Sequence, residues 1–355
     1  MTEASSPTPV DPAAIDYSGR TCLITGGAGF IGSHLAEELL GRGARVVVLD
    51  DLSTGQLANL ERAQTFRTFR FIEAGVGEYE DLEQLISDAD EVYHLAAAVG
   101  VDYVVRYPIE TVTRNIFPTE RVLELAAQHD RPLFLASSSE VYGRGSASRM
   151  RESDDMVLGA PDKTRYIYAL TKLVDEYLAL AYHRQRGLRV VIGRFFNVVG
   201  PRQTGRYGMV IPRFVTQALR GGPITVHDDG NQIRCFMHVR DAVAAIIGLM
   251  NNPAAFGQIV NIGSDTAITI RQLAERVREA TGNHVRIEHI PYEAAYGSGF
   301  EDVRCRIPGL DRLRTLVKLG ELRDLDSILR DVVQYERSRL AGSDEPDAEL
   351  PVAER

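Results

Sequence analysis

The sequence predicts an α/β fold built on a doubly wound parallel sheet, followed by a smaller C-terminal lobe. Three observations predict it. A glycine-rich turn joins an apolar strand to a helix near the N-terminus, apolar strands alternate with amphipathic helices up to residue 200, and shorter pieces rich in Gly, Pro and Arg follow. Strands that alternate with helices form parallel sheets, because each crossover helix covers a face of the sheet.

The glycine-rich turn lies within residues 21–34, TCLITGGAGFIGSH. Gly26, Gly29 and Gly32 have the spacing in which glycines allow a tight turn, close approach of the backbone to a diphosphate, and close packing of helix on strand. A second apolar strand ends in Asp50, about twenty residues further on, where an acid holds an adenosine ribose. Because Asp50 would repel a 2′-phosphate, the pattern predicts a Rossmann-type site for NAD rather than NADP.

The remaining predicted elements follow in chain order. Residues 91–96, 132–137 and 189–194 are predicted strands, and residues 111–129 and 168–186 are predicted helices. We expect a flexible leader at 1–18, an NAD-binding domain at 19–200, a substrate lobe at 201–340 that is partly interleaved with that domain, and a solvated acidic tail at 341–355. Loops of the lobe would cover the carboxyl ends of the strands, where such sheets bind ligands.

Composition excludes several classes of function. The net charge of −9 argues against nucleic acid or an anionic membrane as a partner. Cys22, Cys235 and Cys305 are far apart and the eight histidines do not cluster, so neither a disulfide framework nor a metal site is expected. The N-terminus lacks the apolar run of a signal peptide, and no stretch approaches the roughly 20 apolar residues of a membrane span. We therefore expect a cytoplasmic protein.

The predicted catalytic site is centred on a tyrosine. Tyr168 and Lys172 lie one helical turn apart on the same face, and Ser138 and Glu140 follow the predicted strand at 132–137. A free phenol has a pKa of about 10, which is too high for a base at neutral pH. An adjacent ammonium and the positive ring of oxidised NAD both favour the phenolate, so Tyr168 is the candidate base.

Because it carries the glycine-rich turn together with this serine, tyrosine and lysine, the chain between residues 20 and 336 resembles the extended short-chain dehydrogenase/reductases that act on nucleotide sugars. The resemblance implies that Ser138, Tyr168 and Lys172 form the catalytic trio, with Tyr168 taking a proton from a sugar hydroxyl while hydride passes to NAD⁺. It implies a nucleotide-diphosphate sugar as the substrate. The implied cofactor residues are Gly26, Gly29, Phe30, Ile31, Gly32, Asp50, Leu95, Ala96, Tyr168 and Lys172, and the implied substrate residues are Ser139, Asn197, Arg234 and Arg306.

The resemblance also implies a homodimer. Members of this family dimerise through the helix that carries the tyrosine and lysine and through the preceding long helix, which here are residues 168–186 and 111–129. The apolar side chains that suit such an interface are Leu170, Leu173, Val174 and Leu178, although they equally suit the core of a monomer.

One segment departs from the family pattern. Relatives usually have Gly-Asp-Ile after the third strand, whereas this chain has Ala74-Gly75-Val76. The resemblance therefore implies that the carboxylate which would hydrogen-bond the adenine is missing, and this puts the adenine contact in question.

Three reactions can follow oxidation of the sugar at C4. Epimerisation returns the hydride to the other face of the ketone, decarboxylation releases the C6 carboxylate of a β-keto acid, and dehydration removes a hydroxyl with the help of further acid and base groups. Glu140 resembles the pattern of decarboxylases and of some dehydratases, and Arg306 resembles the decarboxylase pattern. Pro212 resembles epimerases, and Ser139 replaces the aspartate of a dehydratase. We favour a C4 epimerase, followed by a decarboxylase and then a 4,6-dehydratase. A cofactor-binding protein without turnover is disfavoured because the whole trio is present.

Overall fold

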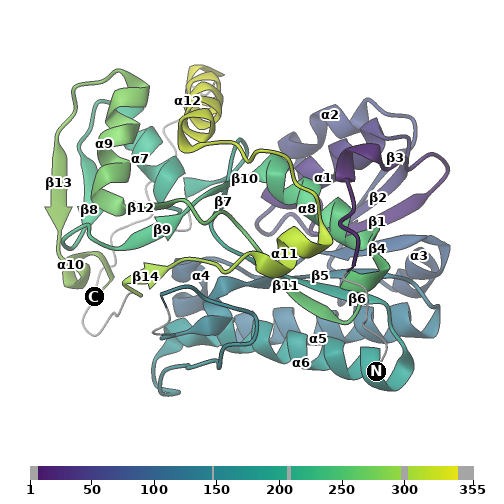
Figure 1. The fold of residues 1–355 in the computed structure, drawn as a ribbon. Coiled ribbons are helices and arrows are strands. Elements are labelled where there is room, and N and C mark those ends of the chain that lie inside the picture. The colour runs from purple at the N-terminus through teal and green to yellow at the C-terminus, as the bar shows by residue number, and fades with distance from the viewer. Residues whose placement is uncertain (1–6, 146–147, 206–208, 297–302, 343–355) are drawn as a thin grey trace.

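A parallel sheet forms the centre of the computed structural model, which describes residues 7–145, 148–205, 209–296 and 303–342 (Figure 1). Its seven strands have the order β11-β6-β5-β4-β1-β2-β3, and every neighbouring pair is parallel. The predicted parallel sheet is therefore confirmed. The strands are β1 (Thr21–Thr25), β2 (Arg45–Asp50), β3 (Phe69–Glu73), β4 (Glu91–His94), β5 (Leu133–Ser138), β6 (Val190–Phe195) and β11 (Gln258–Ile262).

Helices cover both faces of this sheet, and alternate strand residues supply two separate cores. Cys22 and Ile24 of β1 pack on one face, whereas Leu23 packs on the other. The first face is covered by α1 (Phe30–Gly41), α2 (Glu61–Gln64), α8 (Val239–Met250) and α11 (Asp311–Leu316), and the second by α3 (Leu82–Asp88), α5 (Pro108–Gln128) and α6 (Ile167–Arg186). The short helix α4 (Val101–Arg106) leads into α5. The two predicted long helices are thus α5 and α6.

A smaller lobe lies beside the sheet and has its own core around Phe214, Ile224 and Leu273 (Figure 1). It contains α7 (Val210–Leu219), β8 (Ile224–His227), β9 (Ile233–Cys235), β12 (Ala267–Thr269), α9 (Ile270–Thr281), β13 (Ile287–Ile290), α10 (Tyr292–Tyr296), β14 (Cys305–Arg306) and α12 (Leu325–Gly342). The pair β7 (Val198–Val199) and β10 (Met237–His238) leads towards it. Because α8, β11 and α11 return to the main sheet, residues beyond 200 contribute to both units.

The N-terminal segment differs from the flexible leader that we expected at 1–18. Tyr17 is fully buried, and its hydroxyl lies 3.1 Å from that of Tyr93 and accepts a hydrogen bond from Nδ2 of Asn251 at 2.8 Å. Val10 forms a β-bridge with Val317. The described part of this segment therefore packs into the fold, a long-range contact that local composition does not reveal. Residues 1–6, and 343–355 of the expected acidic tail, lie outside the described residues.

No helix in the described ranges combines the length and the apolar character that crossing a membrane requires.

A buried ion pair fixes α6 against the sheet. Nε and Nη2 of Arg194 on β6 donate to the two carboxylate oxygens of Glu176 at 2.9 and 2.7 Å, and both side chains are almost fully buried. The Ser137 hydroxyl, at the end of β5, donates to Oε1 of the same carboxylate at 2.5 Å. The guanidinium carbon also lies 4.7 Å from the ring centroid of Tyr142. This bidentate geometry sets the rotation of α6 relative to the ends of β5 and β6.

The Glu176→Ala substitution is expected to lower the free energy of unfolding by about 3–5 kcal/mol, because it leaves the buried Arg194 without its carboxylate. Urea unfolding followed by circular dichroism measures this. The control is Glu120→Ala on the exposed surface of α5, which should change the free energy by less than about 0.5 kcal/mol. Equal losses for the two variants would mean that the ion pair does not anchor α6.

Candidate functional site

The glycine turn brings three backbone segments into close contact. Gly26 has a φ of +71°, and a Cβ on it would lie 2.6 Å from the amide nitrogen of Ala96. A Cβ on Gly32 would collide with the carbonyl oxygen of Gly26. Alanine at either position would therefore displace backbone. The turn, the start of α1 and the segment after β4 can pack this closely because both residues are glycines.

The start of α1 suits an anion. Gly29 is the N-cap and no side chain caps the helix, whose first residues are Phe30 and Ile31. The unpaired N–H groups of a first helical turn, together with the helix dipole, favour a bound phosphate. A residue without a side chain at the N-cap leaves room for the diphosphate of a dinucleotide.

Asp50 lies beside this turn at the end of β2. Its Oδ2 accepts a hydrogen bond from the Ala28 N–H at 2.9 Å, and its Oδ1 accepts one from the Leu52 N–H at 2.8 Å. Burial raises the pKa of Asp50, although the two N–H groups act in the opposite direction. The geometry of the turn and of this carboxylate fits NAD, and the binding of its diphosphate at α1 and of its ribose at Asp50 stays a prediction.

A neutral histidine supports the strand behind the cradle. Nδ1 of His94 lies 2.7 Å from the Thr25 hydroxyl, and Nε2 lies 3.0 Å from the Thr119 hydroxyl. Because Thr119 donates its proton to the Asn115 carbonyl, it accepts the Nε2–H of His94. Burial lowers the pKa of His94 to about 3. The segment that follows it, Leu95 and Ala96, is the one that contacts Gly26.

The structure brings the predicted trio together. Ser138 ends β5, and its hydroxyl accepts a hydrogen bond from the Glu140 N–H at 3.2 Å. Tyr168 and Lys172 lie on the first turns of α6. Burial and the negative charge of Glu140 raise the pKa of Tyr168 well above its usual value, whereas a hydrogen bond with the Ser138 hydroxyl lowers it. The phenol is therefore protonated in the protein alone.

Lys172 has a carboxylate partner of its own. We expected its ammonium to lower the pKa of Tyr168, but Nζ of Lys172 donates to Oδ2 of Asp175 at 3.2 Å, and both side chains are buried. Burial raises the pKa of Asp175 to about 6, although the charge of Lys172 opposes this. When bound, oxidised NAD supplies a hydride acceptor and a positive ring that favours the phenolate.

An ion pair between the lobe and the sheet domain lies beside the trio. Nη1 of Arg306 on β14 lies 2.5 Å from Oε1 of Glu140, and the Arg306 side chain is 7% exposed. Burial favours the neutral carboxyl, but the charges of Arg306, Arg165 and Arg234 hold the pKa of Glu140 below its usual value. Glu140 is therefore a carboxylate. Arg306 lies opposite Arg234 in the pairing of β14 with β9, so two of the predicted substrate residues are neighbours.

The other predicted substrate residues have partners or are buried. Nη1 of Arg234 donates to the carbonyl oxygens of residues 233 and 303 at 2.9 and 2.8 Å. Asn197, with a φ of +30°, donates from Nδ2 to the Cys235 carbonyl at 3.0 Å. Ser139 is 3% exposed in the 3-10 helix Ser139–Tyr142. Their contact with a sugar nucleotide remains a prediction.

Sequence reasoning missed Asn115 on α5. Its Oδ1 accepts from the Ala98 N–H at 2.7 Å, and its Nδ2 donates to the Ala98 carbonyl at 3.2 Å and to the Thr171 hydroxyl at 3.1 Å. This fully buried side chain therefore ties the loop after β4 to the catalytic helix. The available signal was the placement of Thr111, Asn115 and Thr119 at four-residue intervals, since three polar residues on one buried helical face need internal partners.

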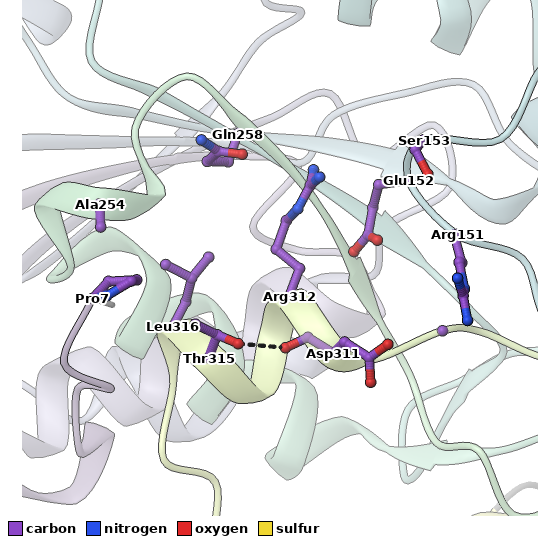
Figure 2. A pocket seen from close by; sticks show the side chains of 11 residues that line it. Pro7, Arg151, Glu152, Ser153, Ala254, Gln258, Asp311, Arg312, Thr315 and Leu316 are labelled. Carbon is purple, nitrogen blue, oxygen red and sulfur yellow. Dashed lines mark hydrogen bonds between the residues drawn. The ribbon is translucent and has the colours of Figure 1, made fainter. Parts of the chain in front are cut away.

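A pocket elsewhere in the molecule contains none of these residues. It has a volume of about 400 Å³, and Arg151, Glu152, Asp311 and Arg312 are among its lining residues (Figure 2). Arg312 donates from Nη1 to the Ile259 carbonyl at 2.6 Å. Among the residues that the structure describes, no three His, Cys, Asp or Glu side chains are grouped so as to hold a metal ion.

Comparison with known proteins shows to which family this fold is related. The sequence model of the NAD-dependent epimerase/dehydratase family matches residues 22–263. The chain is 38% identical over 319 residues to the UDP-N-acetyl-α-D-glucosaminuronate decarboxylase of Bacillus cytotoxicus, covering 90% of this chain and 98% of that protein. It is 33% identical to UDP-glucuronic acid decarboxylase 1 of Arabidopsis thaliana, covering 94% of this chain and 74% of that protein.

A solved structure is similar as well. The UDP-glucuronic acid 4-epimerase of Bacillus cereus, in complex with UDP-glucuronic acid and NAD, superposes with a TM-score of 0.80 at 27% identity, covering 90% of this chain and 99% of that chain. Sequence relatives are thus decarboxylases, while this structural neighbour is an epimerase.

The buried His94 is expected to make the protein sensitive to acid. Its pKa is about 3 in the folded protein and 6.5 when exposed, so below 6.5 the unfolded chain binds a proton that the folded chain does not. Stability should fall as the pH drops, and His94 should contribute about 2 kcal/mol of that fall between about pH 7 and pH 5. Urea unfolding at each pH should show a shallower decline for His94→Gln, while the exposed control His284→Gln keeps the wild-type decline. Identical declines for His94→Gln and the wild type would contradict this.

Proposed function

The chain belongs to the NAD-dependent epimerase/dehydratase family, and within it we propose that the protein is a decarboxylase of UDP-linked uronic acids. The single observation that carries this proposal is the Arg306–Glu140 ion pair beside the catalytic trio. The sequence alone favoured a C4 epimerase. The ion pair favours a uronic acid over a neutral sugar, and the decarboxylase relatives, one of them 38% identical, favour the decarboxylase over the epimerase.

The first step of the proposed reaction uses the trio. Tyr168 accepts the proton of the sugar C4 hydroxyl, and Ser138 hydrogen-bonds the oxygen as it becomes a ketone. Lys172, which is held by Asp175, lies one helical turn from the phenol on the same face of α6. Oxidation at C4 places a ketone β to the C6 carboxylate of a uronic acid, and this arrangement makes loss of CO₂ favourable.

The second step requires a cation near C6. A guanidinium presents N–H donors in a planar fork that matches a carboxylate, so Arg306 can hold the uronate before it leaves as CO₂. Glu140 orients Arg306 from the other side. The Glu140 N–H donates to the hydroxyl of Ser138 at 3.2 Å, which supports a location of this pair beside the trio. A neutral hexose would offer Arg306 no such partner.

The second candidate is a 4-epimerase for a UDP-linked uronic acid. The similar structure of Bacillus cereus favours it, as does Pro212 at the start of α7, which resembles the epimerase pattern. Both candidates share the oxidation at C4 and both can use Arg306 for the carboxylate, so the fate of the C6 carbon separates them.

Incubation of the protein with NAD⁺ and UDP-glucuronate or UDP-N-acetylglucosaminuronate in D₂O, followed by mass spectrometry, tests the proposal. We expect loss of CO₂ with one deuterium gained at C5, because the carbanion left at C5 takes its proton from solvent. An isomer of unchanged mass without deuterium would establish the epimerase instead. UDP-glucose is the neutral comparison and should remain unchanged.

The Arg306→Gln substitution is expected to lower kcat/KM for the uronic acid by about a hundredfold, because the carboxylate loses its cation. Bound NAD, measured after release from the purified protein, should stay at the wild-type level. The matched control is Arg304→Gln, two residues earlier, whose 67% exposed side chain pairs with Asp229 away from the trio. An undiminished kcat/KM in Arg306→Gln would contradict the assignment of Arg306 as the residue that holds the uronate carboxylate.

We also propose that two copies of the chain associate through α5 and α6. These helices pack side by side on one face of the sheet, and their outer surface exposes Ile109 (74%), Phe117 (64%), Leu170 (48%) and Tyr177 (68%). Contiguous apolar side chains on a helix pair favour a protein partner. Of the residues expected from sequence, Leu170 lies on this surface, whereas Leu173 and Leu178 pack against the core.

Light scattering coupled to gel filtration tests this interface. Wild-type protein should have the mass of a dimer, and Tyr177→Glu should have the mass of a monomer, because a charge there opposes burial. Leu57→Glu is the control, since Leu57 is 46% exposed but lies after β2, far along the chain from both helices. A monomeric wild-type protein, or a dimeric Tyr177→Glu variant, would rule this interface out.

A further inference from the structure

We propose that Glu78 supplies the adenine contact that the chain lacks at position 75, with its carboxylate accepting a hydrogen bond from the 6-amino group of the adenine of NAD. This inference rests on the NAD dependence of the family and is independent of which sugar reaction follows. Four features of the segment after β3 carry it.

The first feature is position. The Ala74 N–H donates to the Asp50 carbonyl at 3.1 Å, so Gly75 comes directly after the residue that pairs with the ribose-binding strand. In the sheet, β3 lies beyond β2, on the side away from β1. A dinucleotide with its diphosphate at the glycine turn and its ribose at Asp50 therefore directs the adenine towards the end of β3.

The second feature is the local turn. The Tyr79 N–H donates to the Gly75 carbonyl at 3.0 Å, and this closes a single helical turn that brings residue 78 back over residue 75. A Cβ placed on Gly75 would fall onto Oε2 of Glu78, with Cδ at 3.0 Å and Oε1 at 3.7 Å. The Glu78 carboxylate thus occupies the space into which an aspartate at position 75 would extend. It can do so because residue 75 is glycine.

The third feature is anchoring. Val76 is buried and Tyr79 packs against the same core, so the residues on either side of Glu78 are held by the fold. Nη1 of Arg121 on α5 donates to the Gly77 carbonyl at 2.9 Å. A turn fixed at three points presents its carboxylate in a defined place.

The fourth feature is an unused acceptor. Glu78 is exposed, and within the described part of the chain its carboxylate has no hydrogen-bond or ion-pair partner. A carboxylate only accepts hydrogen bonds, and the 6-amino group of adenine only donates them. Hypoxanthine has a 6-oxo group at this position, which only accepts hydrogen bonds and would repel the carboxylate. The contact therefore favours adenine over hypoxanthine.

Competition between two dinucleotides tests the proposal. Full-length protein is incubated with equal, saturating amounts of NAD and its hypoxanthine analogue until exchange is complete, and the dinucleotides that remain bound are released and quantified by chromatography. Wild-type protein should hold NAD over the analogue by about tenfold, the range expected for one hydrogen bond to a charged group. The readout is the composition of bound cofactor, so it does not depend on turnover.

The Glu78→Ala variant should reduce this preference about fivefold or more, whereas the neighbouring control Glu80→Ala, also exposed, should keep it. Adding Gly75→Asp to Glu78→Ala should restore the preference, because it returns a carboxylate to the same space from the position that relatives use. A wild-type preference in Glu78→Ala, or an equal loss in Glu80→Ala, would overturn the proposal. Because Glu78 is exposed, its removal does not threaten folding.

Discussion

The catalytic geometry depends on the buried ion pair between Glu176 and Arg194. Tyr168, Lys172 and Glu176 follow one another at four-residue intervals, so they share one face of α6. Fixing Glu176 on β6 therefore also fixes the direction of the tyrosine and the lysine. The Ser137 hydroxyl binds the same carboxylate, and its neighbour Ser138 belongs to the trio. The Glu176 carboxylate thus fixes the end of β5 and the helix α6 relative to each other.

Charge is distributed around the phenol in pairs. Lys172 is paired with Asp175 and Glu140 with Arg306, but the negative charges of Glu140 and Asp175 still raise the pKa of Tyr168. Burial then dominates the pKa of Tyr168 and keeps the phenol protonated. A site of this kind favours the phenolate only when a further positive charge arrives. Proton removal is thereby coupled to the presence of the oxidised cofactor.

Local patterns predicted the sheet, the long helices, the glycine turn and the trio, because each depends on residues close together in sequence. They did not predict the burial of Tyr17, the return of β11 to the sheet, or the role of Asn115, because those depend on partners more than fifty residues away. The loss of an aspartate at position 75 was visible, whereas the Glu78 carboxylate in its place was not. That placement requires the turn closed by Tyr79.

Under the proposed function, the choice of a uronic acid as the substrate depends on the contact between the two units of the fold rather than on the trio. Glu140 belongs to the sheet domain and follows β5, whereas Arg306 comes from β14 of the lobe, where it pairs with β9 beside Arg234. The trio alone performs an oxidation that epimerases and decarboxylases share. The lobe adds the cation that a uronate requires. Under the proposed function, substitution in a short lobe strand changes which sugar such an enzyme accepts while the oxidation machinery stays intact, so substrate choice and oxidation are separable parts of one fold.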